Sequence, residues 1–322
     1  MKQIISLIGN ELTEVERSLM NTLSSPVPLI NKVGSYIIAS GGKRFRPLLY
    51  LLVAKGFNYQ GGHNIPLACV FEYIHTATLL HDDVLDHAEM RRGNSSANTL
   101  WGDRISVLVG DFLVSKAFSI LVETGNVKAM QVISQATANV AEGETMQTVR
   151  GGDMSLTEEE YITIITNKTA SLIAAACQTG AIMGNADRDG ELSLRNYGLN
   201  IGIAFQMVDD TLDYVSDSQK FGKALCKDLQ GGKITLPLIY TLSKSSDEDR
   251  QIIADCLNHT ALDMEQVRTI LHLIKKYDGL GYVFMRAREY IRLALSTLNG
   301  FDSAPVRDAL IATANYVVER DW

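Results

Sequence analysis

Proline and cysteine are both scarce in this chain of 322 residues, and each scarcity excludes a class of protein. The 6 prolines fall well below the average usage of about 5%, which argues against a disordered or collagen-like chain and favours long helices. The 4 cysteines are far apart and form no CxxC pair, so we expect reduced, mostly buried thiols and no disulfide framework or zinc site. They are Cys69, Cys177, Cys226 and Cys256.

Positive charge is also in short supply. The sequence has 30 Lys and Arg against 37 Asp and Glu, a net charge of −7, which argues against a protein that binds nucleic acid by neutralising many phosphates. The first 18 residues contain three glutamates and lack the basic start and apolar block of a signal peptide, so we expect a cytoplasmic protein. The uncharged stretch 169–186 is long enough to span a bilayer, but its polar residues and glycines favour a buried helix.

Strand patterns are missing as well, and a helical pattern takes their place. Between glycine pairs, the first at Gly41-Gly42 and the last at Gly231-Gly232, apolar residues recur at three- and four-residue spacing. Thr157 followed by Glu160 is a capping box, which predicts a helix start. We predict a single all-α domain over residues 1–322 with roughly a dozen helices, although length alone favours about two domains.

The strongest local signal is the acidic motif HDDVLD at 81–86, which ends a long apolar run. Along this run Glu72, His75, Thr78, Asp82 and Asp86 follow one another at intervals of three or four residues, which places them on one face of a helix. The other faces are apolar. A helix of this kind is typically buried in protein, with its polar face lining a cavity.

A second motif repeats this design, because Gln206, Asp209 and Asp213 again step by three and four residues through apolar sequence. Carboxylates packed together in an apolar interior repel one another or take up protons, so they call for a cation. Oxygen ligands without a histidine or thiolate cluster favour Mg²⁺, which binds one or two carboxylates together with substrate phosphates. One DDxxD alone is equally consistent with a solvated helix face, but two in matching contexts predict a magnesium diphosphate site.

A diphosphate also needs basic partners, and the sequence offers several. The candidates are Lys43, Arg44, Arg46, Arg91, Arg92, Lys168, Lys223 and Lys233. The first three follow Gly41-Gly42 at an expected helix start, where backbone N–H groups and guanidinium forks can bind an anion. Taken singly, each base is better explained as an ordinary surface residue. His75 is equally well explained as a core histidine, and its position on the acidic face favours a ligand role.

Seven segments occur in a fixed order along the chain: GGKRFRP, IHTATLLHDDVLD, RRG, VLVGDFL, NKTASL, FQMVDDTLD and GGKITLPLIY. Together they resemble the trans-isoprenyl diphosphate synthases, and within them the bacterial long-chain polyprenyl diphosphate synthases that make quinone side chains. The resemblance covers residues 41–240, and the ending 309–320 is similar too. It implies an all-α isoprenoid-synthase bundle around a deep central cavity, a homodimer, and head-to-tail (1′-4) condensation of isopentenyl diphosphate onto an allylic diphosphate such as farnesyl diphosphate.

The resemblance also implies roles for the matching residues. Metal ligands for about two or three Mg²⁺ ions are expected at Asp82, Asp83 and Asp86 on the allylic diphosphate, and at Asp209, Asp210 and Asp213. The allylic diphosphate is expected to contact Arg91, Lys168, Lys223 and Lys233, with Thr169 and Gln206 lining the reacting centre. Isopentenyl diphosphate is expected to bind Lys43, Arg46, His75 and Arg92. The chain departs from the family at Cys226, where glycine is usual, so the loop around Lys223 need not have the family's shape.

Product length is expected to depend on residues just before the first acidic motif, where bulky side chains stop the growing chain in this family. Ala77 and Thr78, the fifth and fourth residues before Asp82, are small. Ideal helical geometry puts Thr78 near the acidic face and Ala77 off it, so the role of Ala77 rests on the resemblance. We predict a hexaprenyl-to-decaprenyl product, with octaprenyl favoured.

Three other functions stay open at this point. They are a geranylgeranyl diphosphate synthase whose cavity floor is set by Phe71 or by residues on a neighbouring helix, a regulatory subunit of a heteromeric prenyl synthase, and a terpene cyclase. Ile74 is a further residue expected to bear on product length. The cyclase is disfavoured by the second set of diphosphate-binding bases, and the subunit by the two complete acidic motifs. We also expect that a lipid product draws the protein into peripheral contact with a membrane.

Overall fold

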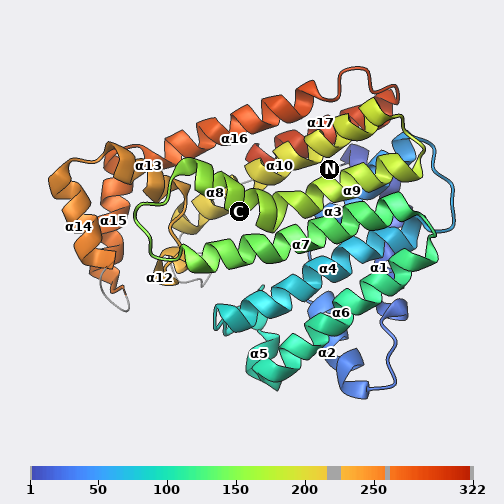
Figure 1. Ribbon diagram of the computed structural model, residues 1–322, viewed down its shortest axis with the longest axis horizontal. Coiled ribbons are helices and arrows are strands. Elements are labelled where there is room, and N and C mark those ends of the chain that lie inside the picture. Colours follow the sequence, from blue (N-terminus) through green and yellow to red (C-terminus); the bar gives the residue numbers. More distant parts are fainter. Residues whose placement is uncertain (1, 216–225, 258–261, 320–322) are drawn as a thin grey trace. The chain divides into compact units, whose positions relative to one another are not determined.

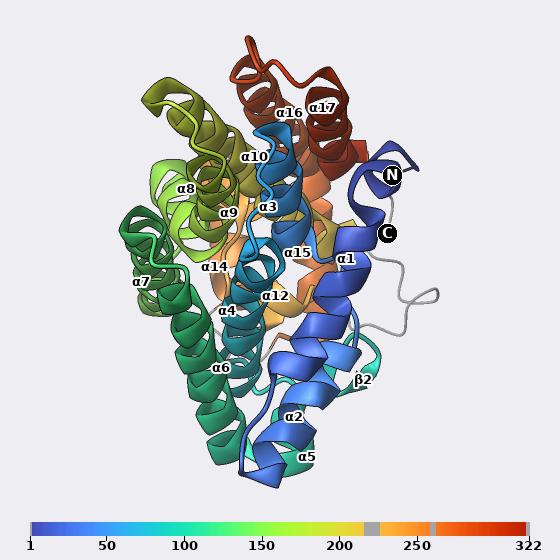
Figure 2. The ribbon, with the colours of Figure 1, turned by 90° about the vertical axis from the view of Figure 1, so that its right-hand side faces the viewer.

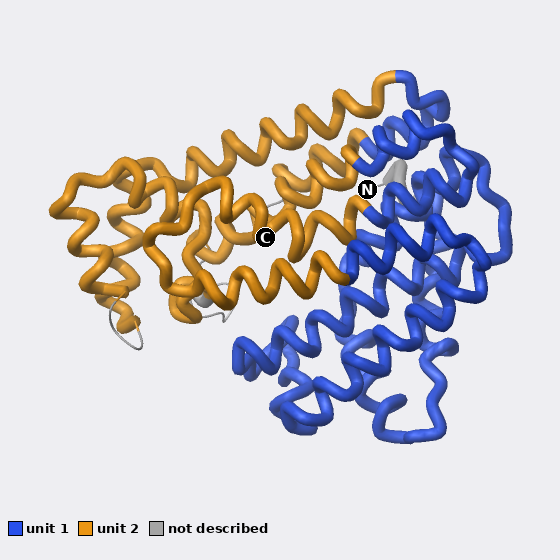
Figure 3. Tube along the Cα trace, viewed as in Figure 1, with its two compact units in different colours: residues 1–137, 175–195, 300–310 blue, residues 138–174, 196–299, 311–322 orange. Residues whose placement is uncertain are grey.

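The structure, a computed structural model, describes residues 2–215, 226–257 and 262–319, and this part of the chain is almost entirely helical (Figure 1). Its strands are one short antiparallel pair, β1 (Met90–Arg91) and β2 (Asn94–Ser95). The all-α prediction is confirmed. The helices form two compact units, which Figure 3 shows in different colours. Each unit is described by itself below, and a single domain stays a prediction.

Unit 1 comprises residues 1–137, 175–195 and 300–310. Its helices include α1 (Lys2–Thr22), α2 (Pro28–Ala39), α3 (Phe45–Gly56), α4 (Asn64–Leu85), α5 (Ala97–Trp101) and α6 (Asp103–Glu123). The central element is α4, which packs against α1, α3 and α6 and runs beside α6 in both ribbon views (Figures 1 and 2). As its apolar sequence predicts, α4 is buried on most faces, with Phe71 and Tyr73 fully enclosed. The acidic motif therefore stands at the end of a rigidly packed helix.

A glycine permits the close approach of α4 and α6. A Cβ atom at Gly110 of α6 would overlap the imidazole ring of His81 in α4. His81 Nε2 also lies 3.2 Å from the carbonyl oxygen of Val107, so the ring bridges the two helices next to the acidic motif. The VLVGDFL segment thus supplies the surface against which the motif is positioned.

Unit 2 comprises residues 138–174, 196–299 and 311–322. The remaining elements, some of which begin or end in unit 1, are α7 (Val127–Val149), α8 (Glu158–Ile165), η1 (Thr166–Ala170), α9 (Ser171–Met183), α10 (Arg188–Val215), α12 (Lys227–Gln230), α13 (Leu236–Lys244), α14 (Asp247–Leu257), α15 (Met264–Lys276), α16 (Gly279–Ser296) and α17 (Ala304–Glu319). The capping box at Thr157 is confirmed as the start of α8. The polar segment 243–250 is mostly helical, because α13 continues to Lys244 and α14 begins at Asp247.

The uncharged stretch, the cysteines and the most apolar long helix can now be placed in the structure. The uncharged stretch 169–186 falls largely in α9, whose side chains are mostly buried, as predicted. All four cysteines are free and buried, which confirms the expected thiols. Among the described helices, α6 has the length and composition needed to cross a membrane. Within the protein, 39% of its most apolar 18-residue stretch is buried.

Candidate active site

The first acidic motif occupies the last turn of α4. Asp82 is half-buried, and Asp86 is the exposed C-cap residue, whose N–H donates to the carbonyl oxygen of Asp82 at 2.8 Å. Residues four apart lie on the same face of a helix. Because the C-terminal end of a helix carries partial negative charge, each carboxylate there is unfavourable by about 0.3–1 kcal/mol. This unfavourable clustering is typical of a site that binds a cation.

Asp83, the middle acid of the motif, has a different environment. Its carboxylate is 0% exposed and accepts hydrogen bonds from Arg91 Nε at 2.7 and 2.8 Å, while Arg91 Nη2 lies 2.6 Å from Oδ1. Arg91 reaches it from β1, and the side chain of Asn98 donates to the carbonyl oxygen of Asp83 at 3.2 Å. The structure thus joins two predicted site residues in an ion pair that fixes the hairpin against α4.

Two of the bases assigned to isopentenyl diphosphate, Arg46 and Arg92, lie close to His75 on the polar face of α4. Arg92 adopts a left-handed backbone conformation with φ of 51°, and its guanidinium lies 3.0 Å from the position of a Cβ at Gly42. Burial, followed by the charges of the surrounding arginines, lowers the pKa of His75 well below its usual range. Those arginines are Arg46, Arg92, Arg91 and Arg44. The imidazole is therefore neutral at pH 7, in a strongly positive environment.

The four residues predicted to control product length lie on α4. Phe71, Ile74 and Ala77 are buried, with exposed fractions of 0, 1 and 0%, whereas Thr78 is half-buried and its hydroxyl donates to the carbonyl oxygen of His75 at 2.8 Å. Ala77 stands one turn before His81, on the side of α4 that faces α6. A larger side chain at Ala77 would therefore enter the space between α4 and α6.

The second acidic motif is on α10, where Asp210 is held in a chain of hydrogen bonds. Tyr161 of α8 donates its hydroxyl to Asp210 Oδ2 at 2.6 Å, and Gln206 donates to Oδ1 at 2.6 Å. Thr169 in turn donates to Gln206 Oε1 at 2.8 Å. Burial, followed by the charge of Asp228, raises the pKa of Asp210 to about 7, while the two hydrogen bonds act in the opposite direction. The structure therefore brings together three predicted site residues and adds Tyr161.

Asp209 and Asp213 flank this buried acid, both half-buried and one helical turn apart on α10. Asp213 Oδ2 accepts the backbone N–H of Asp228 at 2.9 Å, and Lys233 Nζ lies 4.0 Å from Asp228 Oδ1. Asp228 was not predicted, although an acid between the second motif and GGK is a signal that could have pointed to it. Tyr161 gave no such signal, because it reads as an ordinary apolar position of α8.

Cys226 stands where the family usually has glycine, and it keeps the left-handed backbone conformation that glycine favours. Cys226 has φ of 56° and precedes α12, and its N–H donates to the carbonyl oxygen of Asp213 at 3.2 Å. The left-handed conformation is disfavoured for residues with a side chain, so the contact with α10 holds Cys226 in place. Lys223 lies outside the described residues.

Lys168 and Thr169 lie in η1, a single π-helical turn between α8 and α9. Lys168 Nζ is bonded to Gln147 Oε1 at 2.6 Å and Glu144 Oε2 at 2.5 Å. A Cβ at Gly143 of α7 would overlap the backbone of Lys168, and one at Gly202 of α10 would lie 2.6 Å from Ala170 Cα. The π turn therefore packs closely against α7 and α10, where the two glycines leave room for its backbone. Such π turns inside helices are frequent at functional sites.

The donors in both acidic motifs fit a hard divalent cation. Within the described ranges, no three Asp, Glu, His or Cys side chains come together as a complete metal site. Mg²⁺ does not require one, because it binds through one or two carboxylates and takes its other ligands from water and phosphate. The pairs Asp82 with Asp86 and Asp209 with Asp213 match that requirement.

Comparison with known proteins decides the family. Residues 27–274 match the polyprenyl synthetase family. The chain belongs to this family. It is 38% identical over 325 residues to the octaprenyl diphosphate synthase of Escherichia coli K12, covering 100% of this chain and 99% of that protein. The resemblance drawn from the motifs is confirmed, and the protein is an enzyme, a prenyltransferase.

Solved structures agree with this assignment. A polyprenyl synthase from Caulobacter crescentus CB15, determined with calcium and isoprenyl diphosphate, matches with a TM-score of 0.94 at 36% identity, covering 99% of this chain and 97% of that one. A decaprenyl diphosphate synthase from Rhodobacter capsulatus matches with a TM-score of 0.94 at 35% identity, covering 99% of both chains. The fold of this polyprenyl synthetase is therefore that of the polyprenyl synthases.

Proposed function

We propose that the chain is a long-chain trans-polyprenyl diphosphate synthase. It condenses isopentenyl diphosphate head-to-tail (1′-4) onto an allylic diphosphate such as farnesyl diphosphate, and octaprenyl diphosphate for a quinone side chain is the favoured product. The observation that carries this proposal is the full-length similarity to the octaprenyl diphosphate synthase of Escherichia coli. Both acidic motifs and the basic loop are present in the chain, which supports a catalytic protein.

We infer a divalent metal, and propose that it is Mg²⁺, in about two or three ions. Asp82 and Asp86 would hold metal in unit 1, and Asp209 and Asp213 in unit 2. When bound, the metal neutralises the negative charge that develops as diphosphate leaves the allylic carbon. The all-carboxylate donor sets support this inference, as does the Caulobacter crescentus structure with calcium and isoprenyl diphosphate. Asp83 and Asp210 stay predicted ligands whose carboxylates already accept internal hydrogen bonds.

The chain's own residues have the remaining tasks. Lys43, Arg46 and Arg92 would bind the diphosphate of isopentenyl diphosphate beside the neutral imidazole of His75. Arg91, Lys168, Lys223 and Lys233 would stabilise the oxygen charge on the leaving diphosphate, because fixed cations lower the barrier most where charge develops. Thr169 and Gln206 form an ordered pair of dipoles suited to the positive charge left on carbon. Exclusion of water by the apolar surroundings prevents that carbon from being hydrolysed.

A long product is supported by the small side chain of Ala77, five residues before Asp82. The alternative is a geranylgeranyl diphosphate synthase, in which Phe71 or residues on a neighbouring helix would close the cavity. A regulatory subunit of a heteromeric synthase is the non-enzymatic alternative, and the two complete acidic motifs of the chain disfavour it.

We further propose a cytoplasmic homodimer with peripheral membrane contact. The support is the apolar composition of α6, in which Leu108 and Val122 are 53% and 62% exposed. Light scattering of the purified protein would give twice the chain mass for a homodimer. Flotation with vesicles carrying polyprenyl product would measure membrane contact.

One incubation tests the proposed function. The purified chain receives Mg²⁺, farnesyl diphosphate and labelled isopentenyl diphosphate, and the products are sized by chromatography after removal of the phosphates. We expect an octaprenyl product, loss of activity with EDTA, and a loss of several orders of magnitude in Asp82→Ala. A product that stops at geranylgeranyl would favour the alternative, and an inactive wild-type chain would refute the enzyme assignment.

A further inference from the structure

One basic residue of the GGKRFRP segment has a different structural position from its neighbours. Arg44 is the N-cap of α3, in the left-handed conformation with φ of 47° and ψ of 40°, which residues with a side chain adopt only when other contacts hold them there. It follows Gly41 and Gly42, which both have positive φ. The bend from Gly41 to Arg44, which carries Lys43 and leads into the first turn of α3 with Arg46, is therefore a strained backbone that needs an external restraint.

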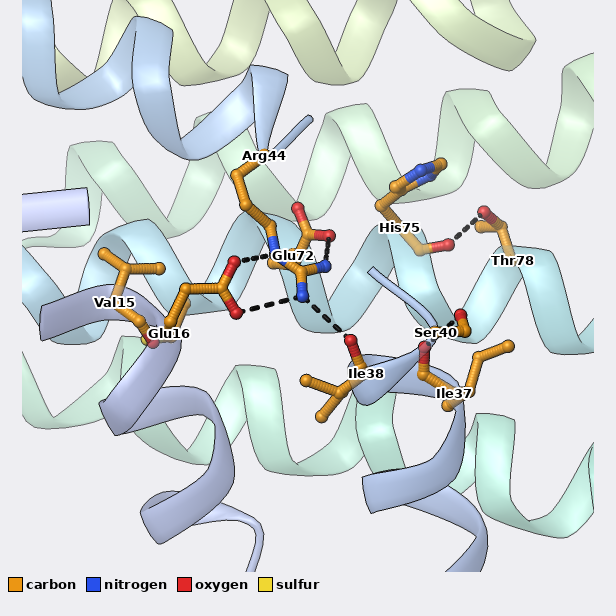
Figure 4. A network of polar contacts seen from close by, with 10 residues as sticks. Val15, Glu16, Ile37, Ile38, Ser40, Arg44, Glu72, His75 and Thr78 are labelled. Atoms are coloured by element: carbon orange, nitrogen blue, oxygen red, sulfur yellow. Dashed lines mark hydrogen bonds and ion pairs between the residues drawn. The ribbon is translucent and has the colours of Figure 1, made fainter. Parts of the chain in front are cut away.

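The guanidinium of Arg44 supplies that restraint (Figure 4). Nε and Nη2 donate to the two carboxylate oxygens of Glu16 in α1 at 2.6 and 3.1 Å, and Nη1 donates to Glu72 in α4 at 2.6 Å. Nη2 also donates to the carbonyl oxygen of Ile38 in α2 at 2.9 Å. Arg44 and Glu72 are only 7% and 3% exposed. One side chain thus ties the start of α3 to three other helices of unit 1.

The same network borders the bases assigned to isopentenyl diphosphate. Gly42 directly precedes Lys43. A Cβ atom built on Gly42 would lie 3.0 Å from Arg92 Nη1 and 3.3 Å from Arg44 Nη1. His75 lies on the same helix as Glu72 (Figure 4). After burial, the positive charges that lower its pKa are those of Arg46, Arg92, Arg91 and Arg44. Without fixed anions, these arginines would repel one another. Glu72 and Glu16 provide the anions, and their contact with Arg44 raises its pKa against the effect of burial.

We propose that Arg44, held by Glu16 and Glu72, is a positioning residue that fixes the bend from Gly41 to Arg44 so that Lys43 and Arg46 can bind isopentenyl diphosphate. The proposal rests on the proposed function and deepens it. Arg44 itself does not touch substrate, because its guanidinium is directed to protein acceptors in α1, α2 and α4.

The decisive test uses two variants whose charge effects have opposite signs. Arg44→Gln removes a positive charge and Glu72→Gln a negative one, so a simple charge effect would weaken isopentenyl diphosphate binding in the first and tighten it in the second. Positioning predicts that both raise the KM for isopentenyl diphosphate by about tenfold or more, because a displacement of about 1 Å in a binding group costs up to about 100-fold. We expect the KM for farnesyl diphosphate to stay within about twofold, because the displaced bases are those of the other substrate.

Milder variants guard against loss of the fold. Glu16→Gln removes one arm of the network at a side chain that is 49% exposed, and should raise the same KM by a few fold. Arg44→Lys keeps the charge but loses the fork, and should lie between wild type and Arg44→Gln. The matched control is Lys55→Gln, which breaks another α1–α3 ion pair, Lys55 Nζ to Glu11 Oε1 at 2.9 Å, at the opposite end of α3. It should leave both KM values unchanged.

Each outcome decides between named readings. A lower KM for isopentenyl diphosphate in Glu72→Gln would overturn positioning in favour of charge, and equal changes in both KM values would show a general structural role. An active wild type with an unchanged Arg44→Gln would overturn the positioning role alone. A wild-type chain that incorporates no isopentenyl diphosphate would overturn the proposed function and, with it, this assignment.

Discussion

Replacing Asp83 by Asn tests whether the middle acid of the first motif stabilises the fold through its ion pair with Arg91. The substitution keeps the shape of a fully buried side chain but removes the charge that Arg91 neutralises. Breaking a buried ion pair by removing one partner costs about 3–5 kcal/mol. Since the Arg91 side chain is 26% exposed and partly screened by water, we expect the lower end of this range, about 3 kcal/mol.

This loss is large enough to measure in a thermal melt. An unfolding entropy of about 2.1 cal/mol/K per residue gives about 0.7 kcal/mol/K for 322 residues, so a loss of about 3 kcal/mol lowers Tm by about 4 °C. Asp82→Asn, the matched control, replaces a half-buried carboxylate at the unfavourable end of the helix dipole, and should shift Tm by less than about 1 °C. The melts are recorded by circular dichroism in EDTA, so that bound metal does not contribute.

A double-mutant cycle completes this experiment. Arg91→Gln should lower Tm as Asp83→Asn does, and the double variant should lose less than the sum of the two, because both remove the same interaction. Equal Tm values for Asp83→Asn and Asp82→Asn, or additive losses in the double variant, would refute the structural assignment of Asp83.

Three further substitutions test other parts of the site. Ala77→Phe should shorten the product towards farnesyl or geranylgeranyl length, measured by chromatography, at a packing cost of about 1–3 kcal/mol; a full-length product would place the floor elsewhere. Tyr161→Phe removes a hydrogen bond to the Asp210 carboxyl and should cost about 1.5–3 kcal/mol in the free energy of unfolding, so an unchanged denaturant midpoint would contradict this role of the hydroxyl. Because the pKa of His75 is lowered in the folded state, the unfolded chain binds more protons below about pH 6.5, and stability should fall from pH 7 to pH 5. In His75→Gln this part of the pH dependence should disappear. If the free energy of unfolding, measured by chemical denaturation, changed with pH as steeply in His75→Gln as in the wild type, the assignment would be refuted.

Much of the site could be predicted from local pattern. The three- and four-residue spacing of Asp82 and Asp86, and of Asp209 and Asp213, gives their shared faces directly, because helical geometry is set by nearby residues. The start of α8 at Thr157 follows from the same kind of short-range rule. Such features need no knowledge of the tertiary fold.

The partners of the charged residues could not be predicted in this way. Arg44 resembles its basic neighbours in sequence, yet it pairs with Glu16 and Glu72, each 28 residues away. Asp83 likewise meets Arg91 only because a short hairpin turns the chain back onto α4. These pairings depend on how helices pack, so acids and bases that look alike in the sequence separate into structural and ligand-binding groups only in the folded protein.

The closely packed π turn has a consequence for how relatives of this enzyme can vary. The backbone at Lys168 and Ala170 fills the space that side chains at positions 143 and 202 would need. The additional residue in the π turn and the two glycines therefore depend on one another. Relatives in which this turn is an ordinary α-helix should therefore be one residue shorter there and free to carry larger residues at both glycine positions. A substitution at either glycine alone should be tolerated poorly, and best rescued by deleting one residue from the turn.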